Sequence, residues 1–370
     1  MRTIFFLLQK EFIQIFRNKM MLPIIFVMPI IQLLILSYTA TFEIKNADIA
    51  FVDLSQSRSS RELIAKFKGS PFFTIKGNAF SIKQYDKSML NGDIDIIIKI
   101  PNDFESSLLN GRSTFVQLIS DAVNGSAANL MTAYALQILF DFNRNIITET
   151  YGKDLMSSQI KILPRYWFNP ELNYKTYMVP GILVLLVSLI GAFLSGMNVV
   201  REKEIGTIEQ LNVTPIKKYQ FIIGKLFPFW VIAMVDLIFG LILAKLVFAI
   251  PILGSVALIL GVAAIYMILV LAFGLFISTI TDTQQQAMFI AWFFFVIFII
   301  MSGLFTPVEG MPKWAQIINI INPIAYFIDF MRLVMLKGAD FVDVQMQILK
   351  ITVYAITMLG LSIIRYRKNA

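Results

Sequence analysis

The residue types that carry most enzymatic chemistry are missing from this chain. Its 370 residues contain no histidine and no cysteine, which excludes thiol nucleophiles, Ser-His and Cys-His pairs, and the commonest transition-metal ligands. The nucleotide-binding patterns GxxxxGK[ST] and GxGxxG are also absent. Asp93 and Asp95 lie in a strand-like run with Lys99, where solvated charge at a strand edge is a better interpretation than a metal site. We therefore expect no catalytic residue, no metal and no cofactor on this chain.

The segment 201–225, REKEIGTIEQLNVTPIKKYQFIIGK, has the most regular pattern of charged and apolar residues. Ile205, Ile208 and Leu211 recur every three residues, as on one face of a helix. Charged residues occupy the other faces, and Pro215 ends the helical pattern. Such an amphipathic helix either contacts a soluble partner with its outer face or lies in the lipid interface. The pattern alone does not separate these alternatives.

Segment 201–225 lies between long apolar runs, which are candidates for the transmembrane helices that position it. The chain is 57% hydrophobic and 15% charged, and a helix needs about 20 apolar residues to cross a membrane. The runs that fit are 20–42, 176–200, 226–244, the second half of 246–281, 283–308 and 344–364. They predict a polytopic α-helical membrane protein with six transmembrane helices. Small residues at four-residue spacing predict close helix packing at Ala192/Gly196, Ala257/Gly261 and Gly274/Ser278.

Basic residues set the orientation of these spans. Segments 1–19, 201–225 and 365–370 hold 12 Lys and Arg in 50 positions, whereas segment 309–350 holds four in 42. Because basic loops remain on the cytoplasmic side, both termini and segment 201–225 are predicted to be cytoplasmic. The formal net charge of +8 therefore needs no nucleic acid to explain it.

The first and the fifth connections have predicted structure of their own. Residues 1–19 alternate apolar and charged positions, which favours a helix lying in the inner interface over a longer first span. The run 20–42 is longer than the core of a cleaved signal, so we expect a retained first transmembrane helix. Segment 309–343 contains Pro323, and charged residues such as Arg332 lie near the middle of its apolar run. It is predicted as an outer helical segment of the five-helix region 176–370.

Residues 43–175 have a different composition from the rest of the chain. Fifteen basic and fourteen acidic residues mark a water-exposed domain of ordinary size. Strand-like runs at 49–54, 72–75, 94–100 and 115–120 are interleaved with helical runs at 59–68, 82–90 and 102–109, and a long helix is expected at about 127–150. Ile94, Ile96, Ile98 and Ile100 are expected to share one strand face. The pattern predicts an α/β extracytoplasmic domain between spans 1 and 2.

These motifs resemble those of one transporter family. Segment 201–225 is similar to the coupling segment of type-2 ABC transporter permeases, whose six-span subunits form dimers and work with separate ATPase subunits. The stretch GLFTPVEGMPKWAQIINIINPIAYFIDFMRLVMLKG, 303–338, resembles that family's outer segment between spans 5 and 6. A domain that begins IAFVDLSQS and contains NGDIDIIIKIP and ISDAVNG resembles the drug-exporter-like branch. The order and spacing of these motifs extend the similarity over nearly the whole chain.

The resemblance implies a role for several residues and partners. The positions that match the coupling pattern, and would contact an ABC ATPase subunit, are Glu202, Glu204, Gly206, Thr207, Glu209, Leu211 and Pro215. The family's substrate path runs between spans 2 and 5, where the candidates are Asn198, Trp292, Phe295 and Ile299, although a Phe-rich span facing lipid gives the same pattern. ATP and magnesium would bind the partner ATPase. A second permease copy or a related permease would complete the dimer in a bacterial inner membrane, and a periplasmic adaptor is left open.

Asp236 is the only charge within the third span. An ionised carboxylate there costs about 2.5 to 3.5 kcal/mol on insertion scales, so this residue must be protonated, paired or facing a wet cavity. It either contributes to the transport path or a subunit contact, or forms a helix–helix hydrogen bond within the chain. The whole pattern predicts a permease subunit of an ATP-driven exporter that moves an amphiphilic substrate outward by alternating access. The alternative is a membrane-anchored receptor that binds its partner with the 43–175 domain.

Overall fold

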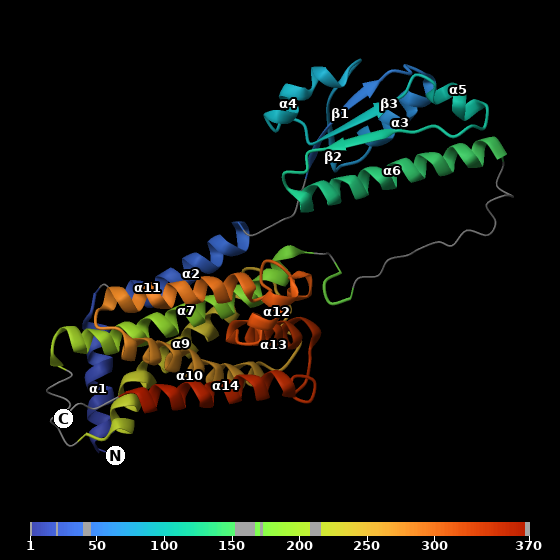
Figure 1. Ribbon diagram of the computed structural model, residues 1–370. Helices are drawn as coiled ribbons and strands as arrows, with labels where there is room; N and C mark the ends of the chain where they lie inside the picture. The colour runs from blue at the N-terminus through green and yellow to red at the C-terminus, as the bar shows by residue number, and fades with distance from the viewer. Residues whose placement is uncertain are drawn as a thin grey trace. The chain divides into compact units, whose positions relative to one another are not determined.

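The computed structural model describes residues 2–19, 21–39, 46–151, 167–170, 173–207 and 216–366. The chain divides into two compact units (Figure 1). Phe42–Pro164 forms one, here called the sheet unit, and Met1–Thr41 with Arg165–Ala370 forms the other, here called the helical unit.

The sheet unit is built on four strands in the order β2-β1-β3-β4. β1 (Ala47–Asp53) pairs in parallel with both β2 (Phe73–Ala79) and β3 (Ile96–Ile100), and β4 (Gln117–Ser120) is antiparallel to β3. The connections contain α3 (Arg58–Lys68), a 3-10 turn η1 (Ile82–Gln84), α4 (Asp86–Leu90) and α5 (Phe104–Leu109), and α6 (Gly125–Tyr151) follows the sheet. The strand and helix runs predicted from the sequence therefore all correspond to elements of the structure.

Both faces of the two central strands, β1 and β3, are buried. Ile96, Ile98 and Ile100 pack in one core with α3, α5 and α6. Ile97, on the opposite face, packs with the two strands beside it and with Ile94. Ile94 was expected on the face of Ile96, and this expectation was wrong. Because β3 begins only at Ile96, Ile94 lies before the pleat that alternates the faces.

The helical unit contains the apolar spans. Its helices are α1 (Arg2–Arg17), α2 (Met21–Thr39), α7 (Tyr174–Glu204), α9 (Lys218–Leu246), α10 (Val256–Ile280), α11 (Gln284–Met301), α12 (Lys313–Asn319), α13 (Pro323–Lys337) and α14 (Gln345–Arg365). Among the described residues, the five helices α7, α9, α10, α11 and α14 are long and apolar enough to cross a membrane. α2 contributes a shorter apolar stretch, Ile25–Thr39. These helices make the chain a polytopic membrane protein.

The segment between α11 and α14 is bent. α12 and α13 are long and apolar enough to cross a membrane only when taken together, and they meet at an angle of 86°. Arg332 of α13 holds this pair against the beginning of α7, because its guanidinium donates to the carbonyl of Gly303 at 3.0 Å and stacks on the ring of Tyr177 at 3.7 Å. This geometry fits the predicted outer helical segment better than a straight extra span.

α7 is the most enclosed of the five long helices. It packs closely on α10, where Ser195 Oγ donates to the carbonyl of Leu271 at 2.8 Å. A Cβ atom added to Gly274 would collide with the backbone of α7 at Ala192. The close packing predicted from small residues therefore joins two helices of one chain at this point, whereas Gly261 faces open space.

The two ends of the helical unit are formed by different helices. α1 crosses one end of the bundle, and the α12–α13 pair lies at the other (Figure 1). Ile15 of α1, Phe221 of α9 and Tyr366 after α14 belong to one apolar cluster, so the first and last described helices meet at the same end. α1 ends at Arg17 and α2 begins at Met21, so the described residues form two separate helices here.

Candidate functional site

Four charged side chains from three helices meet where α1 crosses the bundle. We call Lys10, Glu11, Glu202 and Lys225 the charge cluster. Lys225 Nζ lies 2.7 Å from Glu11 Oε1 and 2.7 Å from Glu202 Oε1. Lys10 Nζ lies 3.1 Å from the same oxygen of Glu202. The cluster ties α1 to the last turn of α7 and to the first turns of α9.

The charge cluster is buried and electrically balanced. The exposed fractions of the side chains are 3% for Lys225, 1% for Glu11 and 7% for Glu202, while Lys10 is 46% exposed. Asn198 also donates to Glu11 Oε2 at 3.3 Å. Buried charges are tolerated only while their partners are present, since each lone charge would bear its full desolvation cost. The position of α1 is therefore coupled to those of α7 and α9.

The next two residues of α7 bind two further helices. Lys203 Nζ donates to the carbonyls of Ser278 at 2.5 Å and Thr281 at 2.8 Å, at the end of α10. Glu204 accepts from the backbone N–H of Gln284 at 2.7 Å, at the start of α11. Because successive helical residues point about 100° apart, Glu202, Lys203 and Glu204 reach different neighbours. This last turn of α7 thus connects α1, α9, α10 and α11.

The predicted coupling segment begins inside α7 rather than as a separate helix. α7 continues through Glu204, and Gly206 follows with a φ of +78°. A Cβ on Gly206 would meet open space, so glycine is required there for the left-handed conformation that ends a helix. Glu209, Leu211 and Pro215 lie outside the described residues.

The remaining coupling residues have different environments. Glu204 is exposed, but Glu202 is buried and its carboxylate already has Lys10, Lys225 and the Thr207 hydroxyl as partners. In this structure Glu202 therefore offers no free carboxylate to a soluble protein. Sequence reasoning missed the roles of Glu11 and Lys225. The only signal in the sequence near them was that Glu11 interrupts an apolar stretch and that Lys225 borders one.

The candidate substrate-path residues divide among three places. Asn198 and Trp292 line one cavity of about 670 Å³, beside the charge cluster and against α1 and α11. Phe295 is instead 3% exposed and packs on the rings of Phe193 and Phe273. Ile299 is partly buried against the main core. The buried residues of α11 are spaced four apart, at Ala287, Ala291 and Phe295, so the ring of Phe295 points into the helical unit.

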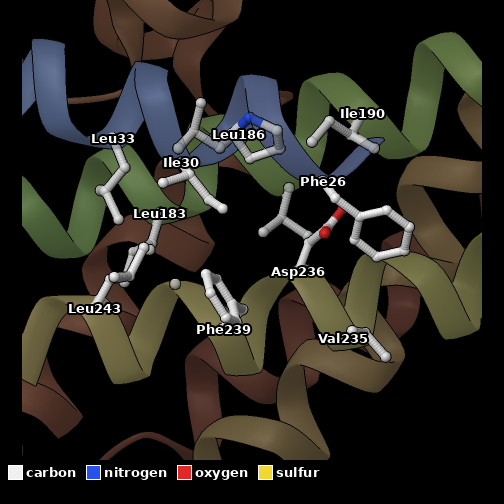
Figure 2. Close-up of a pocket in the computed structure, with 13 residues that line it drawn as sticks. Phe26, Ile30, Leu33, Leu183, Leu186, Ile190, Val235, Asp236, Phe239 and Leu243 are labelled. Atoms are coloured by element: carbon white, nitrogen blue, oxygen red, sulfur yellow. The ribbon is translucent and has the colours of Figure 1, made fainter. Parts of the chain in front are cut away.

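Asp236 lies away from both groups. It lines a cavity of about 120 Å³ between α2, α7 and α9, and Figure 2 shows its carboxylate among apolar side chains. The residue is 9% exposed, and its Oδ2 atom has no hydrogen-bond partner. No residue in the described ranges pairs with it, so the helix–helix hydrogen bond considered from the sequence is absent there.

The contacts of Lys203 lead to a local prediction. Lys203→Met removes the donor of two carbonyls at the end of α10, and hydrogen bonds from charged groups each contribute about 1.5 to 3 kcal/mol. We expect backbone amides 281–286 to exchange hydrogen roughly tenfold faster or more, measured by hydrogen-exchange mass spectrometry. Lys218→Met, at an exposed position, is the control. Unchanged exchange in this connection would show that Lys203 does not hold it.

The fold and these sites define a polytopic helical membrane protein, and the described ion pairs of its helical unit lie in the charge cluster. The sequence model of the ABC-2 family transporter protein matches residues 19–364. The chain therefore belongs to the ABC-2 transporter family, as its motifs predicted. A receptor that uses its spans only as an anchor is not favoured by this membership.

Relatives of this chain are named as ABC transporters or as their permeases. It is 30% identical over 334 residues to the probable multidrug ABC transporter permease YbhR of Escherichia coli, with 90% of each chain covered. It is 26% identical to the probable multidrug ABC transporter permease YbhS of the same organism, over 97% of this chain and 95% of the relative. ABC transporter G family member 20 of Dictyostelium discoideum is 22% identical, and the match covers 46% of that longer protein.

Proposed function

We propose that this chain is the membrane-spanning subunit of an ATP-driven exporter, in which a separate ABC ATPase binds segment 201–225. Family membership supports a transport role. The observation that carries the coupling proposal is the last turn of α7, where three consecutive charged residues contact four other helices. A displacement of this turn would reach α1, α9, α10 and α11 together.

The proposed mechanism is alternating access. ATP and magnesium bind the partner chains, and closure of two ATPase subunits moves the 201–225 segments of two permease subunits, identical or related. Glu204, Gly206, Thr207, Glu209, Leu211 and Pro215 form the proposed contact surface. Glu202 has a different role in this proposal: through the charge cluster it transmits the movement to α1 and α9.

The proposed orientation follows the basic residues. Segments 1–19, 201–225 and 365–370 carry the excess of Lys and Arg, which supports cytoplasmic termini in a bacterial inner membrane. α1 and the end of α14 meet at the end that carries the charge cluster, in agreement with this side being cytoplasmic. The sheet unit would then lie outside the membrane, where an adaptor would have access to it.

The cavity beside Asn198 and Trp292 is the proposed entrance for substrate. Its volume of about 670 Å³ and its mostly apolar lining, which includes Phe289 and Met288, suit an amphiphilic molecule. Because Asn198 also contacts Glu11, this cavity shares a wall with the charge cluster. Movement of the cluster would therefore change the shape of the cavity.

A charge reversal in the contact segment tests the proposal. Full-length chain is purified from its native membranes, and co-purified P-loop ATPase is quantified by mass spectrometry. Glu209→Arg is expected to lower the recovered ATPase by about tenfold or more, because a reversed charge at an interface costs several kcal/mol. The control is Glu309→Arg, an exposed residue near the α12–α13 pair. Equal recovery with both variants, or no ATPase with the unaltered chain, would refute the proposal.

A further inference from the structure

Asp236 is chemically isolated in the helical unit. The three helices around its cavity are α2, α7 and α9. α2 has no charged residue, α7 has none between Lys175 and Arg201, and α9 has none but Asp236 between Lys225 and Lys245. No described residue forms a hydrogen bond or ion pair with it. A buried carboxylate without a partner is costly, and a ligand bound in this cavity would supply the missing partner.

The cavity is small and reaches the surface of α9. Its volume of about 120 Å³ is similar to that of an engineered protein cavity of about 150 Å³ that binds benzene. Val235 and Phe239 line it on either side of Asp236, and they are 46% and 47% exposed. Figure 2 shows the carboxylate directed into the space between α9 and α2. The cavity therefore admits a small head group while a longer apolar tail remains outside.

We infer that this cavity binds the ammonium group of a cationic amphiphile, with Asp236 as its counter-ion. An ammonium supplies both the positive charge and the hydrogen-bond donors that the carboxylate lacks. The apolar walls, including Leu183 and Ile30, contact the first carbon atoms of the tail. The identification of this molecule as cargo in transit rests on the proposed export function.

The depth of Asp236 favours cargo over a resident lipid. It lies eleven residues after Lys225 and nine before Lys245, which at 1.5 Å per residue is roughly 13 to 16 Å from either lysine. The two lysines therefore bracket about 30 Å of α9, the thickness of a bilayer core, so lipid headgroups lie near the level of either lysine and Asp236 lies near the middle. A lipid headgroup would have to leave that level to reach Asp236. An amphiphile that is crossing the membrane passes this depth in any case.

The test compares two probes that differ only in charge. Full-length chain in phosphatidylglycerol nanodiscs is titrated with radiolabelled dodecylammonium or dodecan-1-ol, and binding to empty nanodiscs is subtracted. We expect one saturable site per chain that prefers the ammonium about tenfold or more over the alcohol. Asp236→Asn should reduce this preference to about twofold or less, and Asp236→Glu should retain it. Asp329→Asn, at an exposed position on α13, is the matched control and should also retain it.

Each result decides the inference. No preference in the unaltered chain overturns it, even if the variants fail to fold, and an undiminished preference in Asp236→Asn also overturns it. Adding phosphatidylethanolamine to the nanodiscs distinguishes the sources of the ammonium. Unchanged binding supports a transported amphiphile, whereas competition by this lipid overturns that assignment. The assay contains no ATPase, so a failure of ATPase recovery in the Glu209 experiment would leave the binding result unaffected.

Discussion

Lys225→Met will lower the free energy of unfolding of this chain by about 3 to 5 kcal/mol, the loss typical of a buried ion pair from which one partner is removed. The substitution leaves the carboxylates of Glu11 and Glu202 buried without the ammonium that both contact at 2.7 Å. Lys10 is half-exposed and lies 3.7 Å from Glu11, so it replaces only part of the lost charge. The measurement is the thermal unfolding midpoint of the purified chain in detergent.

Two further variants separate charge from packing in this prediction. Lys218→Met, an exposed lysine on the same helix, should leave the midpoint nearly unchanged. Combining Lys225→Met with Glu11→Gln and Glu202→Gln removes the unpaired charges and should restore most of the lost stability. If Lys225→Met and Lys218→Met unfold at the same temperature, the charge cluster does not stabilise the junction of α1, α7 and α9.

The spans were predictable because the signal that defines them is local. An apolar run of sufficient length decides membrane crossing regardless of its neighbours, and the predicted run 344–364 differs from α14 (Gln345–Arg365) by one residue at each end. The ends of other helices were less predictable. α9 begins at Lys218, eight residues before its apolar run, and α7 continues through Glu204. Hydropathy reports where the hydrocarbon ends, whereas a helix continues beyond it.

The partners of charged residues were not predictable from one sequence. Glu202, Lys203 and Glu204 have the composition of a solvated helix face, and the family resemblance implied that Glu202 and Glu204 contact an ATPase. In the structure Glu202 and Lys203 are occupied by partners from α9 and α10. Such pairs join positions that are distant along the chain, and no local pattern distinguishes them from surface charges.

The close approach of α7 and α10 leads to the second large effect. Gly274→Ala adds a methyl group where the nearest atoms are the carbonyl oxygen of Ala192, the hydroxyl of Ser195 and the backbone nitrogen of Gly196. Two of these three belong to the backbone, so a side-chain rotation cannot relieve the collision and the two helices must separate. Overpacking of this kind costs about 1 to 3 kcal/mol. We expect a lower unfolding midpoint in detergent.

Gly261→Ala is the control because it makes the same change on the same helix. A Cβ atom at Gly261 meets nothing within 4 Å, and alanine is favoured over glycine in a helix by about 1 kcal/mol. Its unfolding midpoint should therefore stay the same or rise, while that of Gly274→Ala falls. If both variants shift the midpoint equally, helix propensity alone explains the result, and contact between α7 and α10 at Gly274 does not limit stability. A fall confined to Gly274→Ala would show that the contact between α7 and α10 at this position limits the stability of the helical unit.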